Sequence, residues 1–183
     1  MTDDLNEIDA TLEASGPIPR DRVVRWIEGT SDLRTLAKLY RLTDEGYSRI
    51  QPDLGMDATC ALIQRYLLQC IRENVKDDEV LSRFDAAMDL HGWLRHLLSM
   101  GGNEKVLRDA ATAITDLFLN SGEDVRYTLE TGFLEHALET EGLRPYFEHW
   151  AADPVLRVAW EAALAWGKAH PDYMARLVDG KND

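Results

Sequence analysis

Apolar side chains recur every three or four residues along most of this 183-residue chain. That spacing places them on one face of an α-helix, and we find no β-branched alternation with hairpin turns. The stretch 80–100 has the widest apolar face, which is typical of a helix that packs on two sides. Its members are Phe84, Ala87, Met88, Leu90, Trp93, Leu94, Leu97 and Met100. The sequence therefore predicts an all-α fold.

Short breaks divide this pattern into helices. Asp77-Asp78, Gly101-Gly102 and Ser121-Gly122 interrupt the second half, and such short breaks imply neighbouring helices that turn back on each other. The expected helices cover 2–14, 19–28, 32–42, 57–75, 80–100, 104–119, 123–139, 154–169 and 171–178, with a short connecting segment over 143–151. Helices begin about 23 residues apart between 57 and 103, so an antiparallel helical bundle and a short HEAT-like array of helical hairpins both fit.

Polar residues at the expected helix starts predict side-chain caps. Ser31 or Asp32 would cap the helix over 32–42, Asn103 the helix over 104–119, and Asp153 the helix that opens at Pro154. The largest apolar residues of the later helices should be mostly buried. These are Phe84, Leu97, Ile114, Phe133 and Trp166.

The N-terminal segment differs from the rest of the chain in charge. Residues 1–18 contain five acids and no base, and Ser15–Pro19 breaks the chain with a glycine and two prolines. We expect an acidic N-terminal helix and linker over 1–18, solvated on most sides, and a single all-α domain over 19–183. The segment 19–49 has the reverse balance, with bases outnumbering acids.

The net charge of −13 limits the possible partners. Such a surface repels phosphate backbones and anionic headgroups, so we expect neither a nucleic-acid nor a membrane partner. No apolar run approaches the roughly 20 residues of a membrane helix, and no signal peptide is found. Cys60 and Cys70 lie too far apart on one helix to pair and are expected to be buried thiols. These features favour a cytoplasmic protein with a basic protein partner.

Catalytic and cofactor motifs are absent from the sequence, so we predict no catalytic residue, metal ligand or cofactor. Two weaker patterns were considered as metal sites. Asp85, Asp89 and His96 fall near one helix face, and the pairs Glu135-His136 and Glu148-His149 could meet across two helices. The favoured explanations need no metal: an ordinary solvated helix face for the first pattern, and surface carboxylates beside half-buried histidines for the second.

Charge distribution is the most informative feature. The stretch 122–153 holds eight acids and two bases, a local charge of −6. Aromatic residues lie within it, and interfaces combine buried aromatic anchors with charged rims. The residues predicted to bind a partner are Glu135, Glu139, Glu141, Tyr146, Glu148 and Trp150. Trp150 could be the aromatic anchor of this set, but large aromatics are more often core residues, and a core position is the favoured interpretation.

The chain resembles the small, acidic, helix-rich immunity proteins of bacterial toxin systems. The likeness lies in size, acidity, helical hairpins and the two segments Gly132-Phe-Leu-Glu-His136 and Tyr146-Phe-Glu-His-Trp150. It implies a protein that neutralises or escorts a basic partner by charge and shape. Two other functions fit the sequence: a HEAT-like scaffold that binds a peptide, and a metal-dependent hydrolase that uses His136 and His149.

Overall fold

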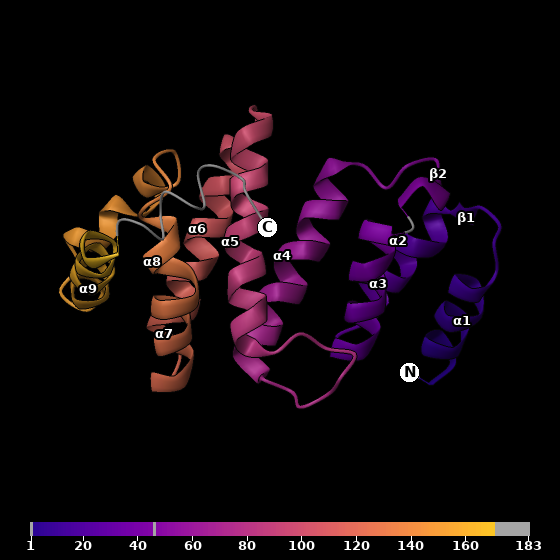
Figure 1. Ribbon diagram of the computed structural model, residues 1–183. Helices are drawn as coiled ribbons and strands as arrows, with labels where there is room; N and C mark the ends of the chain where they lie inside the picture. Colours follow the sequence, from indigo (N-terminus) through magenta and orange to yellow (C-terminus); the bar gives the residue numbers. More distant parts are fainter. Residues whose placement is uncertain (1, 46, 171–183) are drawn as a thin grey trace. The chain divides into compact units, whose positions relative to one another are not determined.

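The structure is a computed structural model that describes residues 2–45 and 47–170 (Figure 1). It confirms the all-α fold, because helices and their short connections make up most of the described chain. None of these described helices is long and apolar enough to cross a bilayer. The chain divides into two compact units, Met1–Ser82 and Arg83–Asp183. The expected single domain over 19–183 includes parts of both units and stays a prediction.

The first unit combines helices with one very short pair of strands. Its described helices are α1 (Thr2–Glu13), α2 (Arg20–Gly29), α3 (Leu33–Glu45) and α4 (Met56–Glu73), with a 3-10 turn η1 at Tyr47–Arg49. The strand β1 (Ile18–Pro19) pairs in parallel with β2 (Ile50–Gln51), so that Ile18 lies opposite Ile50. The sequence predicted a loop in place of β2, because two residues are too few to show an alternating pattern.

The core of the first unit lies around α3, which packs against α4 and α1. Leucines of α3 and α4 are fully buried there, among them Leu36, Leu39, Leu62 and Leu67. Of the two candidate caps for α3, the structure selects Asp32, whose Oδ2 accepts hydrogen bonds from the backbone N and the Oγ1 of Thr35. These contacts fix the direction in which the chain enters α3.

Both cysteines lie buried in α4 with free thiols, as expected. Burial raises the pKa of Cys60, and it raises the pKa of Cys70 to about 11. A thiol with a raised pKa is a poor nucleophile near neutral pH. The two residues therefore serve as apolar core side chains.

The helix α1 is not solvated on most sides, and that expectation was wrong. Ile8 is fully buried, and the indole Nε1 of Trp26 donates a hydrogen bond to Glu7 Oε2 at 3.1 Å. The guanidinium of Arg49 donates to backbone carbonyls at the end of α1, including those of Thr11 and Leu12. A helix leaves its last carbonyls without partners, and Arg49 satisfies them from the other side of the Ser15–Pro19 break.

The second unit begins with two long helices, α5 (Arg83–Met100) and α6 (Glu104–Leu119). After them come α7 (Glu123–Leu129), a π-helical turn η2 (Glu130–Leu134), α8 (Glu135–Ala137), a long 3-10 segment η3 (Arg144–Ala151) and α9 (Leu156–Ala169). The predicted helix over 123–139 thus exists, with a π-helical turn inserted in its middle. The helix expected over 171–178 lies outside the described residues.

The turn between α5 and α6 shows how the helix boundaries arise. Gly101 and Gly102 have φ angles of +69° and +73°, values that favour glycine and end a helix. Asn103 was predicted to cap α6, but its Nδ2 donates instead to the carbonyls of Leu97 and Gly101 at the end of α5. The predicted cap at Asp153 is confirmed, because its Oδ1 accepts from the backbone N of Val155 and Leu156.

Burial in the second unit follows the predicted stripes with two exceptions. Leu97, Ile114 and Phe133 are fully buried, as expected. Trp166 is only half-buried. Phe84 was expected in the core but is 50% exposed, because it occupies the first turn of α5, where its ring lies beside η2.

Replacing Ile8 with Ala should destabilise the first unit. The side chain is fully buried, and deletion of such a buried branched side chain costs about 2–5 kcal/mol of the free energy of unfolding. Urea denaturation followed by circular dichroism measures this cost. Asn6→Ala changes an exposed position of the same helix and should cost less than about 0.5 kcal/mol. Equal stability of the two variants would show that α1 does not complete the core.

Candidate functional site

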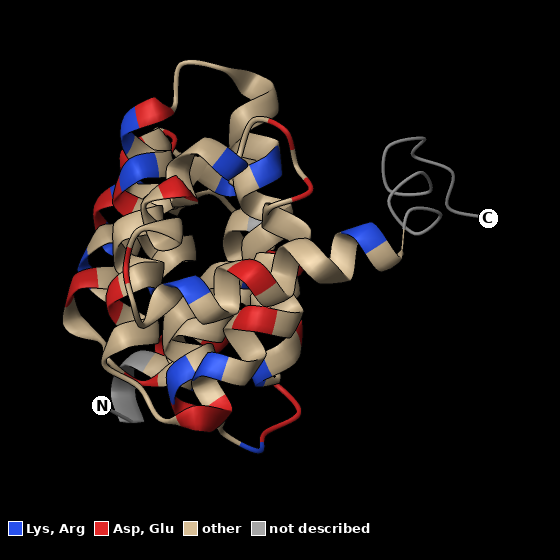
Figure 2. Ribbon diagram, turned by 90° about the vertical axis from the view of Figure 1, so that its left-hand side faces the viewer, with Lys and Arg blue, Asp and Glu red and all other residues tan. Residues whose placement is uncertain are grey.

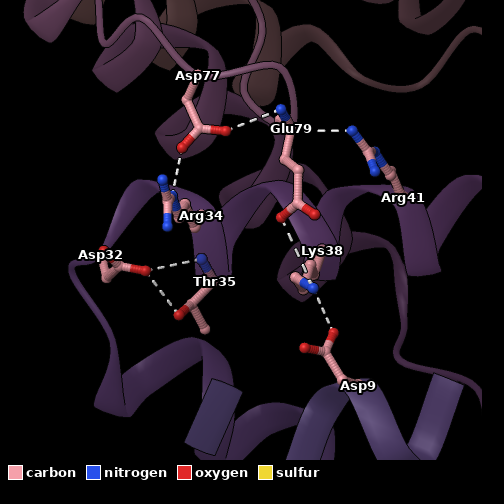
Figure 3. Close-up of polar contacts among 8 residues, drawn as sticks. All are labelled: Asp9, Asp32, Arg34, Thr35, Lys38, Arg41, Asp77 and Glu79. Atoms are coloured by element: carbon pink, nitrogen blue, oxygen red, sulfur yellow. Dashed lines mark hydrogen bonds and ion pairs between the residues drawn. The ribbon is translucent and has the colours of Figure 1, made fainter. Parts of the chain in front are cut away.

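Basic side chains of α3 are used to hold the first unit together (Figure 3). The ammonium group of Lys38 forms ion pairs with Asp9 of α1 and, at 3.7 Å, with Glu79 Oε2. Arg34 forms a hydrogen-bonded ion pair with Asp77, and Arg41 donates to the carbonyl of Glu79 at 3.0 Å. These contacts tie α1 and the segment 77–79 to the two sides of α3.

Asp77 has a defined role within this network. Its carboxylate accepts a hydrogen bond from the backbone N of Glu79 at 2.9 Å. That bond, together with the guanidinium of Arg34, lowers the pKa of Asp77. A carboxylate stabilised in this way stays ionised and keeps the connection between α4 and the second unit folded back on α3.

The other basic side chains of the segment 19–49 also contact groups within the first unit. Arg20 donates to the carbonyl of Leu54 at 3.3 Å, Arg22 and Arg25 lie 3.6 and 3.8 Å from Glu7 Oε1, and Arg49 binds the end of α1. The basic side chains of this segment therefore contact acids and carbonyls of the first unit, although Arg25 and Arg34 remain largely exposed.

The two basic residues of the acidic stretch 122–153 likewise contact groups of their own unit. Arg126 donates from Nε and Nη2 to the carbonyls of Phe118 and Leu119, both at 2.9 Å, and lies over the Phe118 ring. The guanidinium carbon of Arg144 lies 5.8 Å from the centre of the Trp160 ring. Figure 2 shows red and blue segments interleaved along the helices. Four of the eight acids of the stretch are exposed and four are half-buried; the exposed ones are Glu123, Asp124, Glu141 and Glu148.

The predicted binding residues fall into three groups by exposure. Glu141 and Glu148 are exposed, and no ion pair among the described residues involves either of them. Glu135, Glu139 and Tyr146 are half-buried, and Trp150 is buried. Two of the six predicted residues therefore present their charge fully to solvent, in the turn before η3 and within η3.

Glu139 and Glu135 face other parts of the second unit. The carboxylate of Glu139 lies against Gly167 of α9, where an added Cβ would meet its Oε1 at 1.6 Å. Burial raises the pKa of Glu135, and the nearby Glu130 raises it further. Both side chains thus contribute to the packing of α8, and neither is available as a freely exposed charge.

Trp150 is fully buried, which confirms the favoured core position and means that it is not an exposed anchor. Its indole Nε1 donates a hydrogen bond to Thr115 Oγ1 at 2.8 Å, and its ring lies 4.9 Å from that of Phe118 and 6.1 Å from that of Phe147. The sequence placed it in a short connecting segment, which suggested exposure. The segment η3 is instead a 3-10 helix that turns Phe147 and Trp150, three residues apart, toward the same core.

Two buried histidines form a pair that the sequence did not predict. The rings of His91 on α5 and His136 on α8 lie 5.7 Å apart, and the His136 ring packs edge-on against Trp166 at 5.3 Å. His91 Nε2 shares a hydrogen bond with Thr140 Oγ1 at 3.1 Å. These residues are far apart in the sequence, and only the packing of α5 against η2 brings their helices together.

The same geometry bears on the metal-site hypotheses. His136 packs on His91 and Trp166, whereas His149 Nε2 shares a hydrogen bond with Thr115 Oγ1 at 3.2 Å. Within residues 2–45 and 47–170, no three His, Cys, Asp or Glu side chains are arranged to hold a metal ion. Nothing in the described geometry therefore favours the hydrolase hypothesis based on His136 and His149.

Replacing Trp150 with Ala should destabilise the second unit by about 3–5 kcal/mol, as other deletions of buried aromatic side chains do. Thr115→Val should cost about 1–3 kcal/mol, because it leaves the buried indole N–H without its acceptor. Urea denaturation measures both. Tyr127→Ala removes an exposed aromatic of the same unit and should cost less than about 0.5 kcal/mol. If Trp150→Ala leaves the free energy of unfolding unchanged, η3 does not pack on α6.

The histidine pair should make stability depend on pH. Burial lowers the pKa of His91 to about 3, with smaller contributions from His136 and Arg95, and burial also lowers the pKa of His136. In the unfolded chain both histidines accept protons below about pH 6.5. The unfolded state therefore gains protons that the folded state rejects, and the free energy of unfolding falls by up to about 1.4 kcal/mol per pH unit and histidine. The loss begins near the unfolded pKa and continues downward in pH.

Urea denaturation of wild type and His91→Gln between about pH 7.5 and 5.5 tests this dependence, because carboxylates titrate mainly below that window. The raised pKa of Glu130 and Glu135 acts in the opposite direction at lower pH, where the folded state accepts protons first. The variant should lose less stability than wild type as the pH falls. His96→Gln, at an exposed position of the same helix, should retain the wild-type slope. Identical slopes for all three proteins would rule out a titrating His91.

The chain matches no family model, no curated protein and no solved structure. Its own residues are therefore the basis for inferring what it does.

Proposed function

We propose that this protein binds a basic protein partner, which it neutralises or escorts, through the acidic surface of its second unit. The sharpest form of the proposal is an immunity protein that blocks a bacterial toxin, as the sequence resemblance implies. Glu141 and Glu148 are the exposed members of the predicted binding set. They are the charges that an approaching partner would meet first.

One observation carries this proposal: the two cations of the acidic stretch contact groups of their own unit, whereas Glu141 and Glu148 are exposed and form no ion pair among the described residues. Arg126 satisfies the carbonyls of Phe118 and Leu119, and Arg144 lies over Trp160. An ordinary solvated helix surface carries interleaved charges that neutralise one another. Here the negative charge extends into solvent, and a partner with exposed Lys and Arg side chains would neutralise it.

Such a surface acts mainly on the rate of association. Opposite charges attract over a Debye length of about 10 Å at 0.1 M salt, which steers a basic partner toward the acidic face before contact. Exposed ion pairs add little affinity once formed. The partner should therefore bind with a strong dependence of its association rate on ionic strength, and tight binding requires apolar contacts in addition.

Charge reversal at the exposed positions should weaken capture of the partner. Full-length wild type and Glu141→Lys/Glu148→Lys serve as baits in lysate of the source organism at low and high ionic strength. The wild type should retain a protein of basic isoelectric point that high salt releases, and the variant should lose it at low salt. With the purified partner, association should slow several-fold and its salt dependence should flatten.

The matched control places the same charge change on the first unit. Asp21→Lys/Glu28→Lys reverses two exposed carboxylates of α2 and alters the net charge equally. It should reduce capture far less than reversal at Glu141 and Glu148. A captured partner that is acidic, or that resists salt, would contradict the proposed function, and equal losses in both variants would show that net charge alone governs binding.

A further inference from the structure

Among the described residues of the second unit, two large aromatic side chains are exposed, whereas its other Phe, Tyr and Trp side chains are buried or half-buried. Phe84 is 50% exposed and Tyr127 is 69% exposed. Phe84 occupies the first turn of α5 and Tyr127 lies in α7. A single exposed apolar residue is ordinary on a protein surface, but two large aromatics on neighbouring helices can supply the apolar centre of an interface.

The two aromatics come from helices that pack against each other (Figure 1). The first turns of α5 and α7 approach closely, since Arg83 Nη1 lies 4.0 Å from Asp124 Oδ2. The Phe84 ring lies beside η2, where an added Cβ at Gly132 would meet its Cδ2 and Cε2 at 3.3 Å. The absence of a side chain at Gly132 therefore leaves room for the ring against the π-helical turn, while Phe84 stays 50% exposed.

Acidic groups frame this aromatic pair. Asp85 follows Phe84 directly, Glu123 and Asp124 open α7, and all three are exposed. The side chain of Arg83 is 17% exposed and pairs at 4.0 Å with Asp124, whose side chain is 94% exposed. Exposed carboxylates therefore lie on both helices that carry the two aromatics, and protein interfaces combine an apolar centre with charged residues at the rim.

We infer that Phe84 and Tyr127, framed by Asp85, Glu123 and Asp124, form the contact point for a basic segment of the partner. The segment would place an aliphatic or aromatic side chain against the two rings and Lys or Arg side chains on the acidic rim. This inference rests on the proposed function and names the part of the second unit that supplies affinity. Glu141 and Glu148 then steer the encounter, and Phe84 with Tyr127 slows dissociation.

The other exposed apolar pair of the second unit does not have this arrangement and provides a matched control. Val155 and Val158 are 51% and 70% exposed at the start of α9. Arg157 lies between them in the sequence and is exposed as well. A basic partner would meet a like charge there. The valine pair and the aromatic pair are similarly exposed, so they differ mainly in the charge of the residues beside them.

A random 16-residue peptide library displayed on phage, selected against the full-length protein at low ionic strength, tests the inference. Selected peptides should be basic, should carry at least one large apolar residue and should be released by salt. Synthetic copies should bind Phe84→Ser/Tyr127→Ser at least tenfold more weakly than wild type in fluorescence anisotropy. They should bind Val155→Ser/Val158→Ser and wild type equally. If the double variant does not fold, the same measurement is made with Tyr127→Ser alone, because Tyr127 is the more exposed of the two aromatics. This single variant should also bind the peptides more weakly than wild type.

Each other outcome overturns a defined part of the idea. Basic, salt-sensitive peptides that bind the aromatic variants as well as wild type overturn the contact point and leave the proposed function standing. Selected peptides that are not basic, or no selected peptides, overturn both. If sedimentation shows that the wild type self-associates and that Phe84→Ser/Tyr127→Ser is monomeric, a second copy covers these rings and the inference is wrong.

Discussion

The use of arginine and lysine side chains to satisfy internal acceptors is the interaction on which both the fold and the surface of this protein depend. Arg49 binds the free carbonyls at the end of α1, Lys38 joins α1 to α3, and Arg126 completes the end of α6. Arg49 and Arg126 satisfy helix-end carbonyls that have no partner within their own helix, whereas Lys38 forms an ion pair between two helices. Each also withdraws a positive charge from solvent, so the protein that results is more negative at its surface than its composition alone suggests.

The helices were predictable because their apolar spacing and their breaks are local features. The prediction for α6 had the observed bounds, and Asp153 caps the chain before α9 as expected. The side-chain roles that depend on distant neighbours were not predictable. Asn103 turns back to α5 because two glycines in left-handed conformation bring the carbonyls of Leu97 and Gly101 within reach.

The candidate site shows even more clearly that contacts with distant residues cannot be predicted from local sequence patterns. The exposure of Glu141 and Glu148 follows from their place beside a turn, but the burial of Trp150 and the exposure of Phe84 do not follow from their places in the sequence. The indole of Trp150 donates to Thr115, 35 residues earlier, and the ring of Phe84 lies beside Gly132 of η2. The pairing of His91 with His136 likewise joins α5 to α8. No pattern within one helix contains such information, because each pair depends on how two helices pack.

The π-helical turn at Glu130–Leu134 gives the second unit an unusual sensitivity to chain length. A π turn accommodates one residue more than an α turn, so the residues after it are rotated relative to those before it. Removal of a single residue there would restore a regular helix and turn everything beyond it by about 100°. His136 would leave His91, and the carboxylate of Glu139 would leave Gly167. The segment can therefore tolerate substitutions far better than a one-residue deletion, and its length is as much a part of the fold as its composition.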